Sequence, residues 1–220
     1  MTPDRVAVLA SGGLDSAILI ADLARSSVVH PLYITTGLAW EQEERAALRR
    51  FVGALASPNV RPVVELTARL TSLIDAAHWS VAGRGVPAAD APDEAMFIPG
   101  RNILLFSIAA IWCATQDVTR VAIGSLGGNP FPDATPAFFE AFGRSLSLGL
   151  GREVRIEAPY RQRAKADLIA GHRELALDLT LTCANPRNGM HCGACNKCFE
   201  RHSAFVAAGV ADGTRYLQEF

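Results

Sequence analysis

Short apolar runs alternate with segments of helical periodicity along the chain. The apolar runs lie at residues 5–10, 28–35, 60–66, 120–124 and 153–158, and the helical segments at 15–25, 41–56, 101–115, 137–148 and 165–176. Such alternation favours βα units, because two parallel strands need a crossover connection that a helix usually supplies. The pattern predicts an α/β fold in which a parallel sheet of about five strands is flanked by helices. We expect one domain over residues 1–220, since the sequence shows no internal repeat.

Charge and hydropathy limit the classes of partner that fit the chain. The formal net charge is −1 over 220 residues, which gives no electrostatic case for a nucleic-acid or membrane partner. Polar residues and glycines interrupt the apolar run at residues 6–20, so this run does not resemble a signal peptide. The apolar stretch at 103–114 is too short to span a bilayer and predicts a buried helix. We therefore expect a cytoplasmic protein.

A stretch rich in Ala, Gly, Pro and Asp, residues 78–96, interrupts the alternation. This composition predicts a loop rather than a helix or a strand. Long loops in compact domains often cover an active site, so we expect a mobile cover here.

The turn after the first apolar run reads Ser-Gly-Gly-Leu-Asp-Ser, at residues 11–16, and leads directly into a helix. Two glycines permit a tight turn and a close approach of the backbone to a ligand. N–H groups at the helix start and the hydroxyls of Ser11 and Ser16 attract an anion such as phosphate. Asp15 suits a magnesium ligand or a helix cap. A plain strand-to-helix turn is the alternative, but ligands usually bind at this end of the strands in α/β sheets.

This motif resembles the signature of the PP-loop ATP pyrophosphatases. The resemblance implies cleavage of ATP, bound with Mg²⁺, between its α- and β-phosphates. It also implies adenylation of a carboxylate or carbonyl-type oxygen, which a nitrogen or sulfur nucleophile then displaces. The ATP-binding residues that it implies are Leu9, Ala10, Ser11, Gly12, Gly13, Leu14, Asp15 and Ser16.

Four of the five cysteines cluster near the end of the sequence, at Cys183, Cys192, Cys195 and Cys198. Four thiolates at close spacing fit a closed tetrahedral zinc site, and such sites are usually structural. We therefore expect a zinc-binding segment at residues 183–198. Two disulfides, free thiols or an iron–sulfur cluster are alternatives, and His191 is a rival ligand.

Charged residues near the cluster, Lys197, Arg187 and Arg201, are expected to offset part of the negative charge of four thiolates. The fifth cysteine, Cys113, lies in the apolar helical segment. We expect it to be a small buried hydrophobic residue.

The two motifs together resemble the 7-cyano-7-deazaguanine synthase family. Residues 97–102 read Phe-Ile-Pro-Gly-Arg-Asn, which is similar to the family's Phe-Val-Pro-Gly-Arg-Asn, and the run from Cys192 through Arg201 and Phe205 is similar too. The resemblance implies a carbon–nitrogen ligase that converts 7-carboxy-7-deazaguanine, ammonia and ATP to a nitrile on the route to queuosine. It also implies that the four cysteines hold structural zinc.

Two segments depart from the family pattern. Residues 35–41 read Thr-Thr-Gly-Leu-Ala-Trp-Glu where the family carries Tyr-Gly-Gln, and residues 131–135 read Phe-Pro-Asp-Ala-Thr where it carries Tyr-Pro-Asp-Cys-Arg. Both segments are expected near the acid substrate, so a paralogue that acts on a related acid is an open alternative.

Five further residues are candidates for the site. Arg101 suits bidentate binding of a phosphate or carboxylate, so we expect it to act in catalysis and, with Asn102, to bind substrate. Lys165 is a catalytic candidate because its charge would offset that of pyrophosphate or the adenylate. Asp133 is expected to accept from the amine of a purine-like ring, and Phe131 to stack on that ring. Helix capping, solvation, turn formation and core packing are the structural alternatives.

Two other classes of function compete with this reading. One is a related PP-loop amidotransferase or thiolation enzyme acting on another acid or on tRNA, against which the near-neutral charge weighs. The other is a non-enzymatic zinc module, which would not need Ser11 or Asp15. The expected partners are a small acid, ATP and ammonia, and a homodimer is compatible with the sequence.

Overall fold

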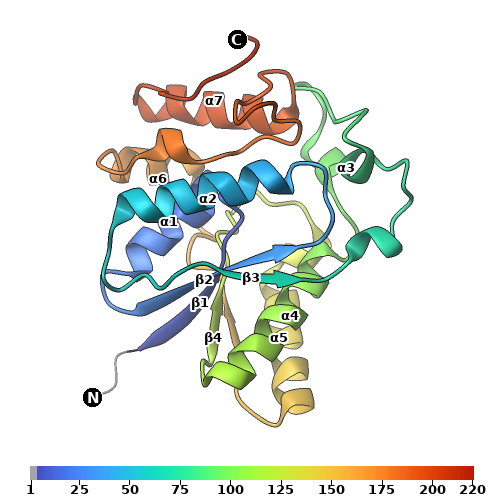
Figure 1. The fold of residues 1–220 in the computed structure, drawn as a ribbon, viewed down its shortest axis with the longest axis vertical. Coiled ribbons are helices and arrows are strands. Elements are labelled where there is room, and N and C mark those ends of the chain that lie inside the picture. Colours follow the sequence, from blue (N-terminus) through green and yellow to red (C-terminus); the bar gives the residue numbers. More distant parts are fainter. Residues whose placement is uncertain (1–3) are drawn as a thin grey trace.

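The computed structural model describes residues 4–220 and contains a five-stranded parallel sheet (Figure 1). Its strands, in the spatial order β3-β2-β1-β4-β5, are Val64–Thr67, Val28–Thr35, Arg5–Leu9, Arg120–Ala122 and Arg155–Glu157. The register pairs Val6 with both Val29 and Arg120, which places β1 at the centre. The α/β fold with a sheet of about five parallel strands is confirmed.

Helices cover both faces of the sheet. They are α1 (Leu14–Leu23), α2 (Glu41–Leu55), α3 (Trp79–Ala82), α4 (Arg101–Gln116), α5 (Pro136–Leu150), α6 (Lys165–Gly171) and α7 (Asn196–Ala208). Figure 1 shows α1, α2, α6 and α7 on one side of the sheet and α4 and α5 on the other. Successive side chains of β1 point to opposite faces, so Val6 and Val8 pack in a core with α1 and α6, while Ala7 and Leu9 pack with α4 and α5.

Several elements differ from the sequence expectation. The third strand begins at Val64 rather than at residue 60, because Pro62 cannot donate to the ladder, and Val60 keeps only an isolated bridge to Val29. Helix α4 is buried on one face only, since Ile103 and Ile111 are 45% and 52% exposed. The stretch 78–96 is not wholly loop, because it contains α3 and a 3-10 turn, Asp93–Met96.

The strand order places a crevice where ligands bind in such sheets. From β1 the chain runs outward through β2 to β3, and it then returns to β4 on the other side of β1. The loops after β1 and β4 therefore leave the sheet side by side. The loop after β4 also lies against the start of α1, because a Cβ at Gly124 would lie 2.9 Å from the carbonyl carbon of Asp15.

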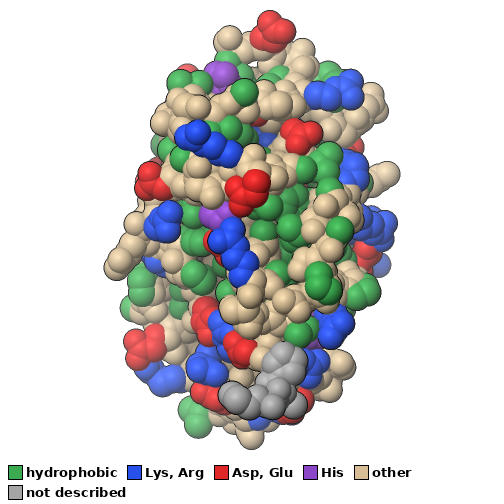
Figure 2. Space-filling model, turned by 90° about the vertical axis from the view of Figure 1, so that its left-hand side faces the viewer, with side chains coloured by type: hydrophobic (Ala, Val, Ile, Leu, Met, Phe, Trp, Pro, Cys, Tyr) green, Lys and Arg blue, Asp and Glu red, His purple; other side chains and the backbone are tan. Residues whose placement is uncertain are grey.

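The surface is mixed in charge. Figure 2 shows basic and acidic side chains interspersed over one face of the molecule, as a net charge of −1 leads one to expect. Within residues 4–220, no helix has the length and apolar character needed to cross a membrane.

Candidate active site and metal centre

A cavity of about 590 Å³ opens at the carboxyl ends of β1, β2 and β4. Its lining includes every predicted ATP-binding residue except Gly12, together with Arg101, Asn102, Phe131 and Lys165. Segments that are far apart in the sequence complete it, from α2, the 78–96 stretch and the start of α7. The structure thus brings most of the predicted site residues into one space.

Gly12 is turned against α2 instead of lining the cavity. Its φ of +75° suits glycine, and a Cβ there would lie 2.4 Å from the carbonyl oxygen of Glu44. Hydroxyls hold the rest of the turn, since Ser11 Oγ accepts from Gly13 N at 3.2 Å and Ser16 Oγ donates to Gly13 O at 3.0 Å. These contacts fix the turn tightly beneath the cavity.

Asp15 does not cap α1. Gly13 is the N-cap residue, and no side chain caps it. The Asp15 carboxylate lies in the first turn, where Oδ2 is 3.3 Å from Lys165 Nζ and Oδ1 is buried without a hydrogen-bond partner among the described residues. Burial raises the pKa of this carboxyl, and the Lys165 ammonium opposes that shift. Of the two roles expected from the sequence, the geometry fits the cation ligand.

Two charged residues that the sequence did not single out for the cavity complete this corner. Lys165 Nζ lies 2.6 Å from Glu200 Oε1, and Lys197 Nζ lies 2.8 Å from Glu200 Oε2. Burial would raise the pKa of Glu200, but the two ammonium groups lower it to about 2. Lys165 is therefore not a solvated surface lysine, since its side chain is only 10% exposed.

The start of α4 carries the predicted substrate residues. Arg101 lines the cavity, and its Nε is buried without a partner in the described part of the chain. Asn102 N and Nδ2 both donate to Asp133, with Asn102 N 3.1 Å from Asp133 Oδ2. Asp133 does not line the cavity. The expectation that its carboxylate faces a ring amine does not fit, because the carboxylate is engaged in holding the start of α4.

A buried acidic pair on α2 also escaped the sequence analysis. Glu41 accepts from Thr36 N and Gly37 N, so both of its carboxylate oxygens stabilise the loop after β2. Glu44 Oε2 accepts from the Tyr33 hydroxyl at 3.1 Å, and Glu44 also lines the cavity. Burial raises the pKa of Glu44 to about 7, against the attraction of the Arg101 guanidinium.

One part of the cavity lining is aromatic and apolar. Trp40 and Trp79 stack with ring centroids 5.5 Å apart and an interplanar angle of 13°. Phe131 lies 5.3 Å from Phe97, measured between ring centroids. Trp40, Trp79 and Phe131 line the cavity, so this part of the lining offers flat surfaces to a planar ring.

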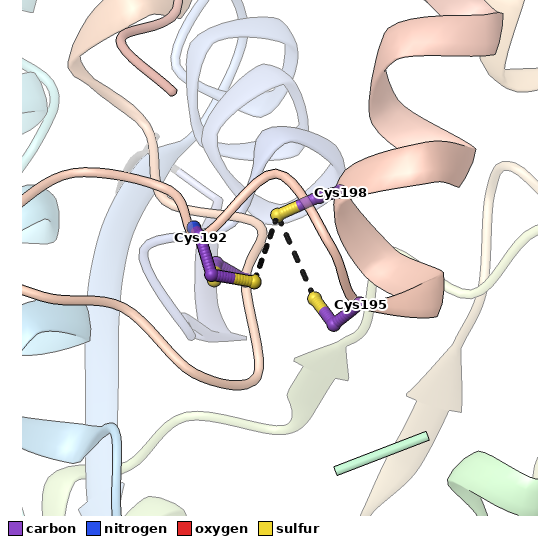
Figure 3. Close-up of side chains that lie close together, drawn as sticks. Cys192, Cys195 and Cys198 are labelled. Atoms are coloured by element: carbon purple, nitrogen blue, oxygen red, sulfur yellow. Dashed lines mark hydrogen bonds between the residues drawn. The ribbon is translucent and has the colours of Figure 1, made fainter. Parts of the chain in front are cut away.

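The four cysteines of the predicted zinc segment form one buried cluster, and Figure 3 shows three of them, Cys192, Cys195 and Cys198. Their sulfur atoms all lie within 4.8 Å of one another, and Cys198 Sγ is 3.8 Å from Cys192 Sγ and 3.5 Å from Cys195 Sγ. A tetrahedron with metal–sulfur bonds of about 2.3 Å has sulfur–sulfur edges of about 3.8 Å. The cluster therefore fits a tetrathiolate metal site, and its cysteines form no disulfide.

Backbone groups and neighbouring side chains also suit thiolates. Cys183 Sγ accepts from Asn185 N and Cys192 N, each at 3.3 Å. His191 does not compete with the cysteines as a metal ligand. Its Nε2 accepts a hydrogen bond from Thr182 N at 2.9 Å, and the ring lies outside the cluster. Burial lowers the pKa of His191 to about 3, so the ring is neutral.

Two of the basic residues that were expected to offset the charge of the thiolates, Arg201 and Lys197, make contacts with other groups. Arg201 is fully buried and donates to Thr180 Oγ1, Thr182 Oγ1 and Leu177 O, which joins α7 to the segment before Cys183. Lys197 turns to Glu200. Cys113 lies in the core as expected, and burial raises the pKa of its thiol to about 12.

Some signals for the missed residues were present in the sequence. Lys197 and Glu200 are three residues apart on a helix, which is the spacing of an ion pair. Their link to Lys165, by contrast, joins residues 35 apart in the chain and depends on the packing of α6 against α7. Glu44 falls on the same face of α2 as Ala47, Leu48 and Phe51, so a charged residue interrupts the apolar periodicity of that face.

Comparisons with known proteins identify a family for the chain. The family model described as queuosine biosynthesis protein QueC matches residues 5–209. The 7-cyano-7-deazaguanine synthase of Thiobacillus denitrificans is 34% identical, covering 96% of this chain and 97% of that protein. The synthase of Anaeromyxobacter sp. (strain Fw109-5) is 33% identical, covering 98% and 97%, and that of Methanocaldococcus jannaschii is 29% identical, covering 94% and 97%.

One solved structure, titled as a predicted subunit of a tRNA methyltransferase from Methanocaldococcus jannaschii, gives a TM-score of 0.48 at 15% identity over 75% of this chain and 72% of that chain. A likeness at that level carries no argument about function. The family assignment depends instead on the match over residues 5–209 and on relatives aligned over nearly their whole length. The chain belongs to the 7-cyano-7-deazaguanine synthase family.

Proposed function

We propose that the protein is a carbon–nitrogen ligase that converts 7-carboxy-7-deazaguanine and ammonia to 7-cyano-7-deazaguanine at the expense of ATP. The observation that carries the proposal is the Ser11–Ser16 turn at the floor of a cavity that also holds Lys165 and Arg101. The family membership supports the substrate, and the cavity supports the chemistry. Its lining contains both aromatic rings and charged groups.

The charged groups suit adenylation. ATP would lie across the turn, where the backbone and Ser11 and Ser16 bind phosphate oxygens. Asp15, with its unpartnered buried oxygen, would bind the Mg²⁺ that accompanies ATP. Lys165 would offset the charge that develops on pyrophosphate, and Arg101 would orient the carboxylate of the acid.

The reaction then takes two adenylation steps. The acid carboxylate attacks the α-phosphorus, which gives an acyl adenylate and pyrophosphate, and ammonia displaces AMP to form the amide. A second ATP activates the amide oxygen, and loss of AMP leaves the nitrile. Phe131 would cover the heterocycle, while Asn102 and Asp133 would act indirectly by holding the turn that presents Arg101.

We further propose that the metal held by the cysteine cluster is zinc and that its role is structural. The ligand set is four sulfurs, which leaves no open position for catalysis. The cluster packs beside the cavity, since Cys183 is among the lining residues. Zinc would therefore fix the wall of the site rather than take part in the reaction.

The test is incubation with ATP, Mg²⁺, ammonium and 7-carboxy-7-deazaguanine, followed by mass spectrometry of all products. We expect the nitrile, AMP and pyrophosphate. ADP and phosphate as the only nucleotide products would overturn the adenylation chemistry. Turnover with a related acid but not with 7-carboxy-7-deazaguanine would support the adenylation chemistry and change the substrate assignment. The departures from the family pattern at residues 35–41 and 131–135 would then explain the difference in substrate.

Asp15→Ala should abolish turnover while the thermal unfolding transition remains cooperative.

A further inference from the structure

Four charged side chains stand in a row along one wall of the cavity, in the order Asp15, Lys165, Glu200 and Lys197. The two lysines alternate with the two acids, so the row has no net charge. Lys165 is shared, because its Nζ lies between carboxylates of α1 and α7. Glu200 is shared too, because each of its oxygens faces a different ammonium.

The sharing of Lys165 is unequal. Its Nζ is 2.6 Å from Glu200 Oε1 but 3.3 Å from Asp15 Oδ2. A charge-assisted hydrogen bond is strongest near 2.8 Å, so the ammonium is held mainly by Glu200. Asp15 consequently has only the longer contact to the ammonium, and its Oδ1 is buried with no hydrogen-bond partner within residues 4–220.

An unpartnered buried carboxylate oxygen in a cavity is costly unless a ligand satisfies it. A divalent cation would do so. If Lys165 moved fully onto Asp15, the ammonium would compete with that cation for the same carboxylate. We propose that Glu200 is a positioning residue that holds Lys165 away from Asp15 and thereby keeps the Asp15 carboxylate available for the divalent cation bound with ATP.

The position of Glu200 on α7 links this role to the cysteine cluster. Cys195 is the N-cap of α7, and Cys198 lies on its first turn between Lys197 and Glu200. A metal held by both cysteines would fix that turn, which carries Glu200 to within 2.6 Å of Lys165 Nζ. The cluster is therefore placed where it orients the charged row as well as the fold.

The proposal depends on the proposed function only in that ATP and a divalent cation share the cavity. Its test is accordingly a binding measurement that needs neither the acid nor turnover. Mn²⁺ is titrated into protein saturated with α,β-methylene-ATP, and free Mn²⁺ is followed by electron paramagnetic resonance. We expect Glu200→Gln to weaken Mn²⁺ binding on the order of tenfold, since it frees Lys165 to neutralise Asp15.

Three comparisons make the measurement specific. Glu200→Asp retains the charge and should recover most of the affinity, while Glu140→Gln, an equal charge change on the exposed surface of α5, should leave it unaltered. Affinity for the nucleotide analogue without metal should not fall in Glu200→Gln, because the wall becomes more positive. General damage to the site would weaken both ligands together.

The decisive variant is Lys165→Met combined with Glu200→Gln. If Glu200 acts through Lys165, the Gln substitution should change Mn²⁺ affinity less than about threefold once Lys165 is gone. A full effect in that background, or none in the wild-type background, would overturn the proposal. These outcomes do not depend on the products of turnover, so failure of the proposed nitrile synthesis would be seen separately. Should Glu200→Gln not fold, Glu200→Ala replaces it in both backgrounds with the same expected outcomes, and an unchanged Mn²⁺ affinity in the presence of Lys165 would overturn the proposal.

Discussion

At the scale of single residues, the phosphate turn depends on glycine at one position for two separate reasons. Gly12 has a left-handed backbone, and the space where a side chain would stand is filled by the backbone of α2. Backbone atoms cannot rotate away as a flexible side chain can. The turn and α2 are therefore fixed against each other, which keeps the loop rigid beneath the cavity.

Gly12→Ala should destabilise the protein on the order of 2–4 kcal/mol, through the strained φ and the overlap with Glu44 O. It should also abolish binding of ATP. Gly53→Ala is the matched control, because Gly53 lies on α2 with open space around it and should stabilise the helix by roughly 0.5–1 kcal/mol. Urea unfolding and calorimetric titration with α,β-methylene-ATP measure both effects. Equal stability of the two variants would contradict the argument.

Glu44 makes stability depend on pH in a direction that can be worked out. Its pKa rises from 4.5 to about 7 on folding, because burial outweighs the attraction of Arg101. The folded chain thus keeps a proton that the unfolded chain loses, and stability falls as pH rises from about 4.5 to about 7. Above that range the full penalty, about 3 kcal/mol, is present.

Glu44→Gln resembles the protonated side chain and should remove this penalty. The variant should melt above the wild type at pH 8 and close to it at pH 5. Glu43→Gln, an equal charge change on the same helix, serves as control and should not show that difference. Thermal unfolding at the two pH values decides the matter, and a Glu44→Gln effect of equal size at both would show that burial does not control this carboxyl.

At the scale of elements, α7 connects the metal centre with the cavity. Its N-cap and first turn carry two of the cysteines, Lys197 and Glu200 beside them carry cavity charges, and Arg201 joins the helix to the segment before Cys183. The C-terminal segment packs on the loop that precedes Cys192, since Leu217 N donates to His191 O. Loss of the metal should therefore release several contacts at once.

Purified protein should contain about one zinc per chain by elemental analysis, and Cys195→Ser should lose it and unfold at lower temperature, because a structural metal contributes to folding directly. Cys113→Ala removes a buried thiol outside the cluster and should retain the metal. Iron in place of zinc would contradict the metal assignment. Full metal content in Cys195→Ser would contradict the ligand set.

At the scale of the whole molecule, the sequence predicted what depends on local pattern. Alternating apolar runs and helical segments led to the parallel sheet, and the Ser11–Ser16 turn was correctly placed at the carboxyl end of β1. The strand order is not a local property, because it follows from which side of β1 the chain returns to after β3. For the same reason Glu44, Lys197 and Glu200 were missed for the cavity, since burial and long-range packing bring them there.

Asp133, by contrast, was expected in the cavity and does not line it. The family pattern drew attention to it, but the sequence does not reveal that the start of α4 needs an acceptor for Asn102 N. A carboxylate next to a helix start satisfies that need at once. The sequence singled out Asp133 by its residue type, but its hydrogen bonds are made with Asn102, which lies 31 positions away in the chain.

The complete reaction makes a prediction about the fate of oxygen. In the proposed sequence each adenylation joins one substrate oxygen to an α-phosphorus, and each displacement breaks the bond between that oxygen and carbon. Both carboxylate oxygens of the acid should therefore leave in AMP. With ¹⁸O in both positions of the carboxylate, mass spectrometry should find two molecules of singly labelled AMP for each nitrile. If the enzyme stops at the amide, one label should remain in the amide and only one labelled AMP should form. Unlabelled AMP throughout would mean that water attacks the α-phosphorus, and adenylation of the acid would then be wrong, whatever the acid proves to be.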